Sequence, residues 1–450
     1  MTCNIAAQED VDLAVKAARA AFARGSEWRT MDASKRGRML LKLADLMEEN
    51  ADYLASLETV DNGKPFTLSL GDVMFASAVI RYYGGYADKV HGKTIPVDGD
   101  VFAYTRREPI GVVGQIIPWN VPILMLSWKL GPALAMGNVV IMKPAEQTPL
   151  TALAVANLVP KAGFPPGVVN VIPGHGETAG AAISGHPDID KIAFTGSTEI
   201  GRLILKASGN SNCKKVSLEL GGKSPLIIFP DADLDLAATL AHETLFWNQG
   251  QVCCAPTRTY VHADVYDKFV AKSVELAKKR TVGDPFDERT SQGAQRTTSS
   301  SFMERHHSHI ESTQLRSGNL WARFGARMDF ASHRFPQYTT WHYAVMRSFE
   351  FWNNDPVNVS VMKRDLCRRR NADEIFVQFS CCTRGVIKNS YAPGVFNTRV
   401  NTFLSMSAQA PFGGYKMSGI GREMGEDGVL EYTEVKTVSL DSASRLLLRY

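Results

Sequence analysis

The sequence predicts an α/β protein built around a parallel β-sheet. From residue 110 onward, short β-branched runs alternate with segments of helical spacing. The expected strands are residues 112–117, 138–142, 168–172 and 191–194, and the expected helices are residues 150–162, 178–184 and 198–208. Strand, helix and strand at this interval indicate right-handed βαβ units, whose ligands bind beyond the carboxyl ends of the strands.

Two amphipathic helices are expected before this sheet. Apolar side chains recur at helical spacing in residues 9–23 and again in residues 39–47. Each helix therefore presents an apolar face to a core. The chain has 450 residues, of which 44% are hydrophobic, and this length suffices for two or three domains with separate cores.

Charge and cysteine usage narrow the class of protein. The pI near 8.6 arises from an excess of basic residues in one segment. Residues 296–406 hold 15 Lys and Arg but only 8 Asp and Glu, whereas the rest of the chain holds 35 Lys and Arg and 38 Asp and Glu. No aromatic-plus-basic module accompanies this excess, so we expect no nucleic-acid partner. No uninterrupted apolar run reaches 18 residues, so no membrane partner is expected. Seven cysteines without periodic spacing indicate a reducing compartment.

Three side chains form a candidate catalytic set. Cys253 follows Asn248-Gln-Gly250, a context that packs poorly in a core. A partly ionised cysteine attacks a carbonyl carbon, and a carboxylate held near it, here Glu219, can take a proton from an attacking water. The side-chain amide of Asn120 can donate a hydrogen bond to a developing oxyanion. Together these residues point to covalent catalysis at a thiol.

A candidate dinucleotide site follows the expected strand at residues 191–194. Gly196-Ser-Thr-Glu-Ile-Gly201 opens a helix, so its backbone N–H groups and the helix dipole can face a pyrophosphate. The pattern is not the G-x-G-x-x-G fingerprint, and two glycines framing a helix start remain the alternative. Lys143 and Glu146 follow another strand, and their alternative is an exposed ion pair.

Several further stretches carry a resemblance to a known family. They are Asp61-Asn-Gly-Lys-Pro65, Lys143-Pro-Ala-Glu-Gln-Thr-Pro149, Ala162-Gly-Phe-Pro-Pro-Gly-Val168, Phe194-Thr-Gly-Ser-Thr-Glu-Ile-Gly201 and Pro411-Phe-Gly-Gly-Tyr-Lys-Met-Ser-Gly419. With the segment around Cys253, they resemble the aldehyde dehydrogenase superfamily, and most closely the NAD-dependent mitochondrial and cytosolic members that act on acetaldehyde and retinal. The resemblance implies oxidation of an aldehyde to a carboxylic acid through a thiohemiacetal and a thioester on Cys253.

The resemblance also implies a role for each site residue. Cys253 would be the nucleophile, Glu219 the base that activates water, and Asn120 the oxyanion donor. Cofactor contacts are expected from Ile117, Trp119, Lys143, Glu146, Gly176, Gly196 and Ser197. A substrate tunnel is expected to be lined by Val121, Leu124, Met125, Trp128 and Phe412. No metal is expected. The two oxygens of Glu146 suit paired ribose hydroxyls and repel a 2′-phosphate, so NAD is expected over NADP. The closest relatives commonly carry an aromatic residue at position 121, and valine widens the tunnel there.

The same resemblance implies a division of the chain. It assigns residues 1–90 and 110–221 to a Rossmann-type NAD-binding domain, residues 222–420 to an α/β catalytic domain, and residues 91–109 and 432–450 to a small β element for oligomerisation. A homotetramer in the cytoplasm or the mitochondrial matrix is expected. By comparison with the family, about 50 residues are expected to be missing before Met1, and a transit peptide with them.

Residues 296–406 depart from the resemblance. They contain 13 Arg, 2 Lys and half of the ten histidines, and they lack the Glu-Ile-Phe-Gly-Pro stretch with which the family holds the nicotinamide ribose. We hypothesise a change of reading frame, because wrong-frame reading favours residues with many codons. The alternatives are a divergent domain and a metal site at His306, His307 and His309, which lacks paired Cys or Asp/Glu ligands. The hypothesis predicts that this segment cannot complete the catalytic sheet and leaves its edges exposed.

Two other functions remain open at this point. The chain would be a catalytically inactive protein that retains only nucleotide binding if NAD raised its melting temperature while no NADH formed. It would be a cysteine esterase without redox activity if it hydrolysed esters in the absence of NAD.

Overall fold

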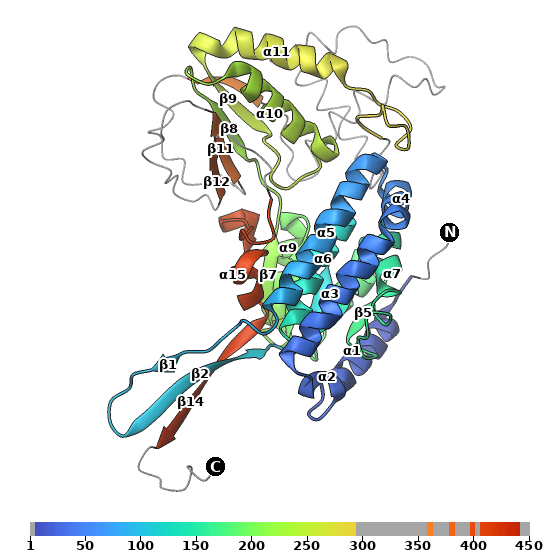
Figure 1. The fold of residues 1–450 in the computed structure, drawn as a ribbon, viewed down its shortest axis with the longest axis vertical. Coiled ribbons are helices and arrows are strands. Elements are labelled where there is room, and N and C mark those ends of the chain that lie inside the picture. Colours follow the sequence, from blue (N-terminus) through green and yellow to red (C-terminus); the bar gives the residue numbers. More distant parts are fainter. Residues whose placement is uncertain (1–4, 294–357, 363–377, 383–396, 401–405, 442–450) are drawn as a thin grey trace.

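Three β-sheets organise the chain (Figure 1). The computed structural model describes residues 5–293, 358–362, 378–382, 397–400 and 406–441. Two of the sheets are largely or wholly parallel and are accompanied by helices, and the third is a narrow antiparallel arm. The predicted α/β class is confirmed. Within the described part of the chain, no helix is long and apolar enough to cross a membrane.

The first sheet has the strand order β13-β7-β6-β3-β4-β5. Its strands are β3 (Val112–Ile116), β4 (Val139–Lys143), β5 (Val169–Val171), β6 (Lys191–Thr195), β7 (Lys215–Glu219) and β13 (Gly419–Ile420). Strands β3 to β7 are parallel, and β13 runs antiparallel to β7. Counted from β3, the parallel strands follow the order 3-2-1-4-5 of a Rossmann-type sheet, which places a ligand crevice at their carboxyl ends.

Helices from the first half of the chain pack around this sheet (Figure 1). They are α1 (Gln8–Phe22), α2 (Glu27–Thr30), α3 (Ala33–Glu49), α4 (Ala51–Asn62), α5 (Phe66–Tyr86), α6 (Pro122–Ala135), α7 (Leu150–Ala156), the π-helical turn η1 (Gly176–Gly180), α8 (Ala181–Gly185) and α9 (Thr198–Asn210). Every residue of α6 is buried, because α3 and α5 pack against it on one side and β4 on another. The predicted helices and strands of residues 1–220 are confirmed except that α7 ends at Ala156, because Pro160 has no N–H to donate to the Ala156 carbonyl and its ring crowds that carbonyl.

The second sheet has the strand order β10-β9-β8-β11-β12, and all its strands are parallel. They are β8 (Pro225–Ile228), β9 (Arg258–His262), β10 (Asn358–Met362), β11 (Gln378–Cys382) and β12 (Asn397–Val400). The helices α10 (Leu234–Phe246) and α11 (Tyr266–Lys279) pack on each other, and the short turns η2 (Trp247–Gly250) and η3 (Ala263–Val265) lie between them and β9. A separate small core holds this layer together, with Leu226, Ile228, Ala238, Val261 and Phe269 at its centre.

Three strands of the second sheet come from the segment that departs from the resemblance. β10 pairs with β9, β11 pairs with β8, and β12 pairs with β11. The prediction that residues 296–406 cannot complete this sheet is therefore wrong. A composition averaged over a long segment hides short stretches of strand character such as Asn358-Val-Ser-Val-Met362, where valines alternate.

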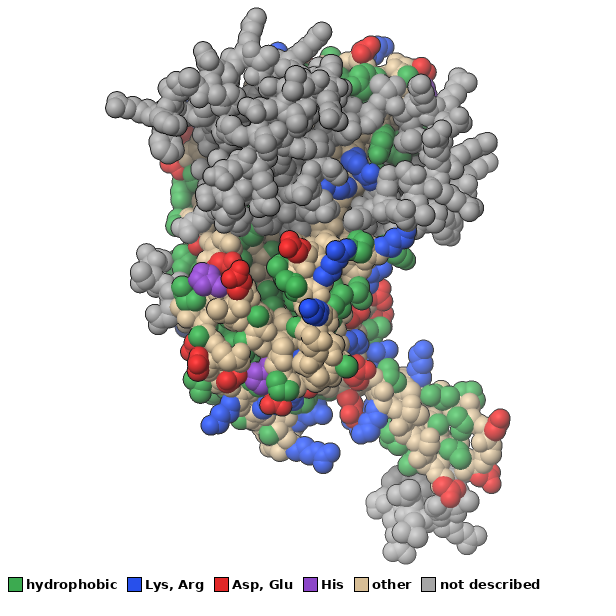
Figure 2. Space-filling view, turned by 180° about the vertical axis from the view of Figure 1, so that it is seen from behind, with side chains coloured by type: hydrophobic (Ala, Val, Ile, Leu, Met, Phe, Trp, Pro, Cys, Tyr) green, Lys and Arg blue, Asp and Glu red, His purple; other side chains and the backbone are tan. Residues whose placement is uncertain are grey.

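The third sheet is an arm that projects from the body (Figure 1). It consists of β1 (Thr94–Ile95), β2 (Val101–Pro109) and β14 (Thr433–Asp441), and β14 pairs antiparallel with the whole length of β2. The helix α15 (Gly425–Leu430) precedes β14. Hydrophobic side chains gather on the surface of the arm (Figure 2), and Val101, Phe102, Val435 and Leu440 are among those exposed.

Candidate active site

The predicted catalytic residues meet where the first sheet ends and the second begins. Glu219 is the last residue of β7, and residues 220–224 lead directly into β8. Cys253 lies between η2 and the start of β9. The Arg258 Nε donates to the Lys223 carbonyl at 3.0 Å, which ties the entry of β9 to the entry of β8. The site therefore combines the carboxyl end of one sheet with the amino end of the other.

The turn before the thiol has an unusual backbone. Asn248, Gln249 and Gly250 have φ values of 47°, 59° and 73°, so three consecutive residues adopt the left-handed conformation. Glycine does so freely and asparagine tolerates it, whereas for glutamine it costs about 1–2 kcal/mol. Side-chain hydrogen bonds hold the turn, because Gln249 Nε2 donates to the Gly293 carbonyl and Asn248 Nδ2 donates to the Asn120 carbonyl at 2.9 Å. The turn thus fixes where Cys253 emerges.

Cys253 is half-buried, and the neighbouring Cys254 is fully buried in the core. The hydrogen bond with Cys254, burial of the thiol and the charge of Glu423 raise the pKa of Cys253 well above its usual value. The thiol is therefore protonated at neutral pH in the surroundings that the chain itself provides. The prediction of a partly ionised thiol needs a further contribution, either a base or a positive charge close to the sulfur.

Glu219 is an unpartnered buried carboxylate. It is 4% exposed, and neither of its carboxylate oxygens has a hydrogen-bond partner among the described residues. Burial, followed by the charges of Glu423 and Cys253, raises its pKa well above the usual value, and Lys129 and Arg422 oppose the shift. A Cβ added at Gly413 would lie 2.9 Å from Glu219 Oε1 and 3.0 Å from the Gly421 carbonyl oxygen, so the glycine leaves room for the carboxylate. A carboxylate of raised pKa that no donor holds is suited to take a proton and to turn toward water.

The side chain of Asn120 lies against the thiol turn. Its Nδ2 donates to the Gln251 carbonyl at 2.7 Å, two residues before Cys253. Its own backbone carbonyl accepts from Asn248 Nδ2 at 2.9 Å and from Asn62 Nδ2 at 3.2 Å. Because an amide nitrogen carries two hydrogens, one donor is left for an oxygen near the sulfur.

A buried ion pair beside Glu219 was not predicted from the sequence. Lys129, which is fully buried in α6, donates to Thr195 Oγ1 at 2.6 Å and pairs with Glu423. Both charged groups act on the pKa of Glu219, in opposite directions. The signal in the sequence was a single lysine inside an apolar helix. Its partner could not be found because Glu423 lies 294 positions away.

The predicted cofactor residues gather at the carboxyl ends of the first sheet. Ile117 follows β3, Lys143 ends β4, and Gly196 and Ser197 follow β6, with Ser197 capping α9 by accepting from the Ile200 N–H at 3.3 Å. Trp119 follows Ile117 at the same end, and its carbonyl accepts from Asn62 Nδ2 at 2.7 Å.

The Lys143 and Glu146 side chains form an ion pair of 3.1 Å between Nζ and Oε2. Burial by itself would raise the pKa of Glu146, but the Lys143 charge and local hydrogen bonds lower it below its usual value, so the carboxylate stays an acceptor. Gly180 packs against the Lys143 stem, with 3.6 Å from its ideal Cβ position to Lys143 Cδ, and joins η1 to this cluster. Gly176 opens η1, and a Cβ there would contact nothing within 4 Å.

The predicted tunnel residues lie on α6 and on the segment before α15. Val121, Leu124, Met125, Trp128 and Phe412 are all buried. The Trp128 and Phe412 rings meet edge to face, with centroids 5.2 Å apart. The Trp128 and Phe412 rings line a cavity of about 10 Å³ together with Met406 and Met424, two residues that the sequence did not indicate. Methionine side chains are flexible, so they can move aside for a substrate.

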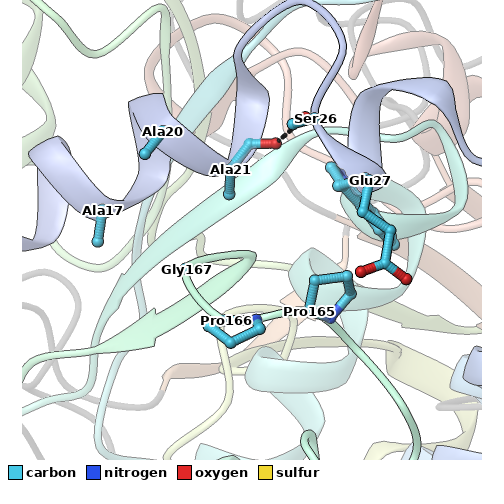
Figure 3. A pocket seen from close by; sticks show the side chains of 9 residues that line it. Ala17, Ala20, Ala21, Ser26, Glu27, Pro165, Pro166 and Gly167 are labelled. Atoms are coloured by element: carbon cyan, nitrogen blue, oxygen red, sulfur yellow. Dashed lines mark hydrogen bonds between the residues drawn. The ribbon is translucent and has the colours of Figure 1, made fainter.

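Other candidate features lie away from this site. A surface cavity of about 410 Å³ is lined by α1, the start of α2 and the Pro165–Gly167 turn before β5 (Figure 3). Its polar side chains are few, and the Ser26 hydroxyl already donates to the Ala21 carbonyl at 2.6 Å. Since the cavity is at the amino end of β5, it is not part of the site. His306, His307 and His309, the metal-site alternative, lie outside the described residues.

Comparisons with known proteins identify a matching family, similar sequences and a similar fold. The model of the aldehyde dehydrogenase family matches residues 1–323 and 389–438, so the unmatched stretch is shorter than the predicted 296–406. The mitochondrial aldehyde dehydrogenase of Mesocricetus auratus is 52% identical over 451 residues, which cover 97% of this chain and 89% of that protein. Cytosolic aldehyde dehydrogenase 1 of Rattus norvegicus is 50% identical, covering 96% and 87%. A solved NAD+ complex of aldehyde dehydrogenase from Bacillus cereus is 39% identical with a TM-score of 0.85, covering 97% and 90%.

Proposed function

The chain belongs to the aldehyde dehydrogenase family, and from this membership and the geometry of the site we propose that it oxidises an aldehyde to a carboxylic acid with NAD as cofactor. The observation that carries the proposal is the meeting of Cys253, Glu219 and the Asn120 amide at the junction of the two parallel sheets.

The first half of the reaction forms a bond between Cys253 and the aldehyde carbon. The sulfur attacks the carbonyl, and the negative charge that develops on oxygen receives hydrogen bonds from the Asn120 Nδ2 and the Cys253 N–H. Because the thiol has a raised pKa, its proton must pass to solvent water before or during the attack.

A bound NAD would supply the hydride acceptor for this oxidation. The residues at the strand ends fit such a cofactor, because the capped N-terminus of α9 offers backbone N–H groups to phosphates and the ionised Glu146 offers acceptors to ribose hydroxyls. In this proposal residues 1–90 and 110–221 form the NAD-binding domain, and residues 222–420 form the catalytic domain. Contacts are assigned to Ile117, Trp119, Lys143, Glu146, Gly176, Gly196 and Ser197.

The second half of the reaction releases the acid. Glu219 takes a proton from water, and the resulting hydroxide adds to the thioester carbon, so that the Cys253 sulfur leaves. Burial of the carboxylate favours this role, since a base of raised pKa accepts a proton more readily. The valine at position 121 leaves room beside the tunnel for an aldehyde bulkier than those accepted when an aromatic side chain stands there.

The exposed arm supports a homo-oligomer, which we propose as the form of the enzyme in the cytoplasm or mitochondrial matrix. Phe102 and Leu440 are 49% and 37% exposed and are direct partners on neighbouring strands, so they form a surface that a second copy can cover. Phe102→Asp and Leu440→Asp are then expected to lower the mass measured by light scattering. Leu13→Asp, at an exposed apolar residue of α1 away from the arm, is the control and leaves the mass unchanged.

The direct test of the proposed function is NADH formation. Mixing the purified chain with NAD and acetaldehyde is expected to produce NADH and acetate in equal amounts. An NAD-induced rise in melting temperature without NADH would instead identify an inactive nucleotide binder. Ester hydrolysis that does not change on adding NAD, with no NADH from any aldehyde, would identify an esterase.

A further inference from the structure

The corner between α4 and α5, residues 61–65, connects three loops of the proposed site. Asp61 Oδ2 accepts the Leu150 N–H at 2.7 Å, at the end of the loop that carries Lys143 and Glu146. Gly63 caps α4 at φ 92° and lies against Gly293, the residue that accepts from the Gln249 side chain. Between these two, Asn62 reaches the loop that carries Asn120.

The Asn62 side chain is completely buried and holds two consecutive peptide groups. Its Nδ2 donates to the Trp119 carbonyl at 2.7 Å and to the Asn120 carbonyl at 3.2 Å. Two successive carbonyls held by one nitrogen fix the relative orientation of the two peptide planes that meet at the Cα of Asn120, and therefore the direction in which the Asn120 side chain leaves the backbone. The Asn248 amide adds a second hydrogen bond to the Asn120 carbonyl from the thiol turn.

A buried ionic cluster makes the corner itself rigid. Lys64 Nζ donates to Glu58 Oε1 at 2.9 Å and pairs with Asp72, and all three side chains are buried. Glu58 Oε1 also accepts the Ile123 N–H at 3.3 Å, in the first turn of α6, just after Asn120 and Val121. The side chains of Asn62 and Glu58 thus hold the loop before and after Asn120.

We propose that Asn62 is a positioning residue for the reaction, which acts through Asn120 by aiming the Asn120 amide at the oxyanion. The inference rests on the proposed function, in which Asn120 donates to that oxygen. Asn62 itself touches neither the thiol nor the substrate. Its contribution is the orientation of a donor, and small errors in such orientation lower a rate by about 10- to 100-fold.

The test compares two reactions of the same thiol in the intact enzyme. The first is the burst of NADH with acetaldehyde and NAD, which needs oxyanion stabilisation. The second is alkylation of Cys253 by iodoacetamide, which forms a carbon–sulfur bond with loss of iodide and develops no oxyanion. Asn62→Ala is expected to slow the burst by about 10-fold or more and to leave the alkylation rate and the NAD dissociation constant nearly unchanged.

A double-mutant cycle then shows whether Asn62 acts through Asn120. In the Asn120→Ala background, Asn62→Ala is expected to slow the burst by less than about twofold, since no amide remains to be aimed. Asn138→Ala is the matched control, because Asn138 is equally buried and also bridges two carbonyls, those of Ala133 and Tyr432, at the amino end of β4. It is expected to lower the melting temperature without changing the ratio of the two rates.

The inference is overturned by equal slowing of burst and alkylation, by full additivity with Asn120→Ala, or by the same change of ratio in Asn138→Ala. If Asn62→Ala does not fold, Asn62→Ser is used, which keeps a hydroxyl donor too short to span both carbonyls and is expected to slow the burst less. If the unmodified chain forms no NADH with any aldehyde, the proposed function fails. A normal burst with an unchanged ratio in Asn62→Ala defeats only the role of Asn62.

Discussion

The two parallel sheets have the same strand order but contribute opposite ends to the site. Counted from its first strand, each follows 3-2-1-4-5. The first sheet contributes the carboxyl ends of its strands, with Lys143, Ser197 and Glu219 at or just beyond β4, β6 and β7, whereas the second contributes the segment that precedes β9 and carries Cys253. The rule that ligands bind at carboxyl ends therefore describes the first sheet alone. Topology fixes where a crevice can form, and the loops decide which end is used.

Separate roles for the two sheets are tested most strongly by Cys253→Ala. The change removes the nucleophile of the second sheet, so NADH formation and ester hydrolysis are expected to fall by about 1000-fold or more, while NAD binding to the first sheet, measured by calorimetry, is retained. Cys254→Ala is the control, because that thiol is buried in the core, and most activity should remain. Equal losses from both substitutions would contradict the assignment of Cys253.

Glu219→Gln separates the two halves of the reaction. The amide keeps the shape of the carboxylate but cannot accept a proton, so steady-state turnover is expected to fall by about 100- to 10000-fold. Rapid mixing should still show a first burst of NADH, because hydride transfer precedes the step that needs water. Loss of the burst together with turnover would show that Glu219 acts chiefly on the thiol.

Glu146→Ala tests the first sheet alone. Loss of the acceptor for ribose hydroxyls is expected to weaken NAD binding by about 10-fold, with no change in alkylation of Cys253. Glu177→Ala, another acidic residue at the same edge in η1, is the control and should leave NAD affinity unchanged. A slower alkylation of Cys253 in Glu146→Ala would mean that NAD binding by the first sheet and thiol reactivity at the second sheet do not depend on separate residues.

The two sheets also differ in how far the sequence predicts them. In the first, short strands and helices alternate regularly, and the motifs that end at Lys143 and Glu219 lie next to the strands that position them. In the second, β10, β11 and β12 are stretches of four or five residues inside a segment of unusual composition, and only their pairing in the fold identifies them. The Lys129 and Glu423 pair was missed for a related reason, because a buried ion pair depends on which distant residue the fold brings close.

The smallest expected effect concerns the influence of the Glu423 charge on the pKa of Glu219, which lies at the junction of the two sheets. Glu423 raises the pKa of Glu219, and a base works only when deprotonated, so turnover must rise with pH as Glu219 ionises. Glu423→Gln removes the negative neighbour of Glu219 and leaves Lys129, whose positive charge lowers the pKa of Glu219. The acidic limb of the pH–rate profile is therefore expected to move to lower pH. At a pH on that limb, the rate is expected to rise severalfold. Glu434→Gln is the control, because Glu434 lies on the arm, where it forms an exposed ion pair with Lys215 of β7, and it should leave the acidic limb in place. A limb that stays in place or moves to higher pH in Glu423→Gln, with an unchanged melting temperature, would show that ionisation of Glu219 does not limit turnover.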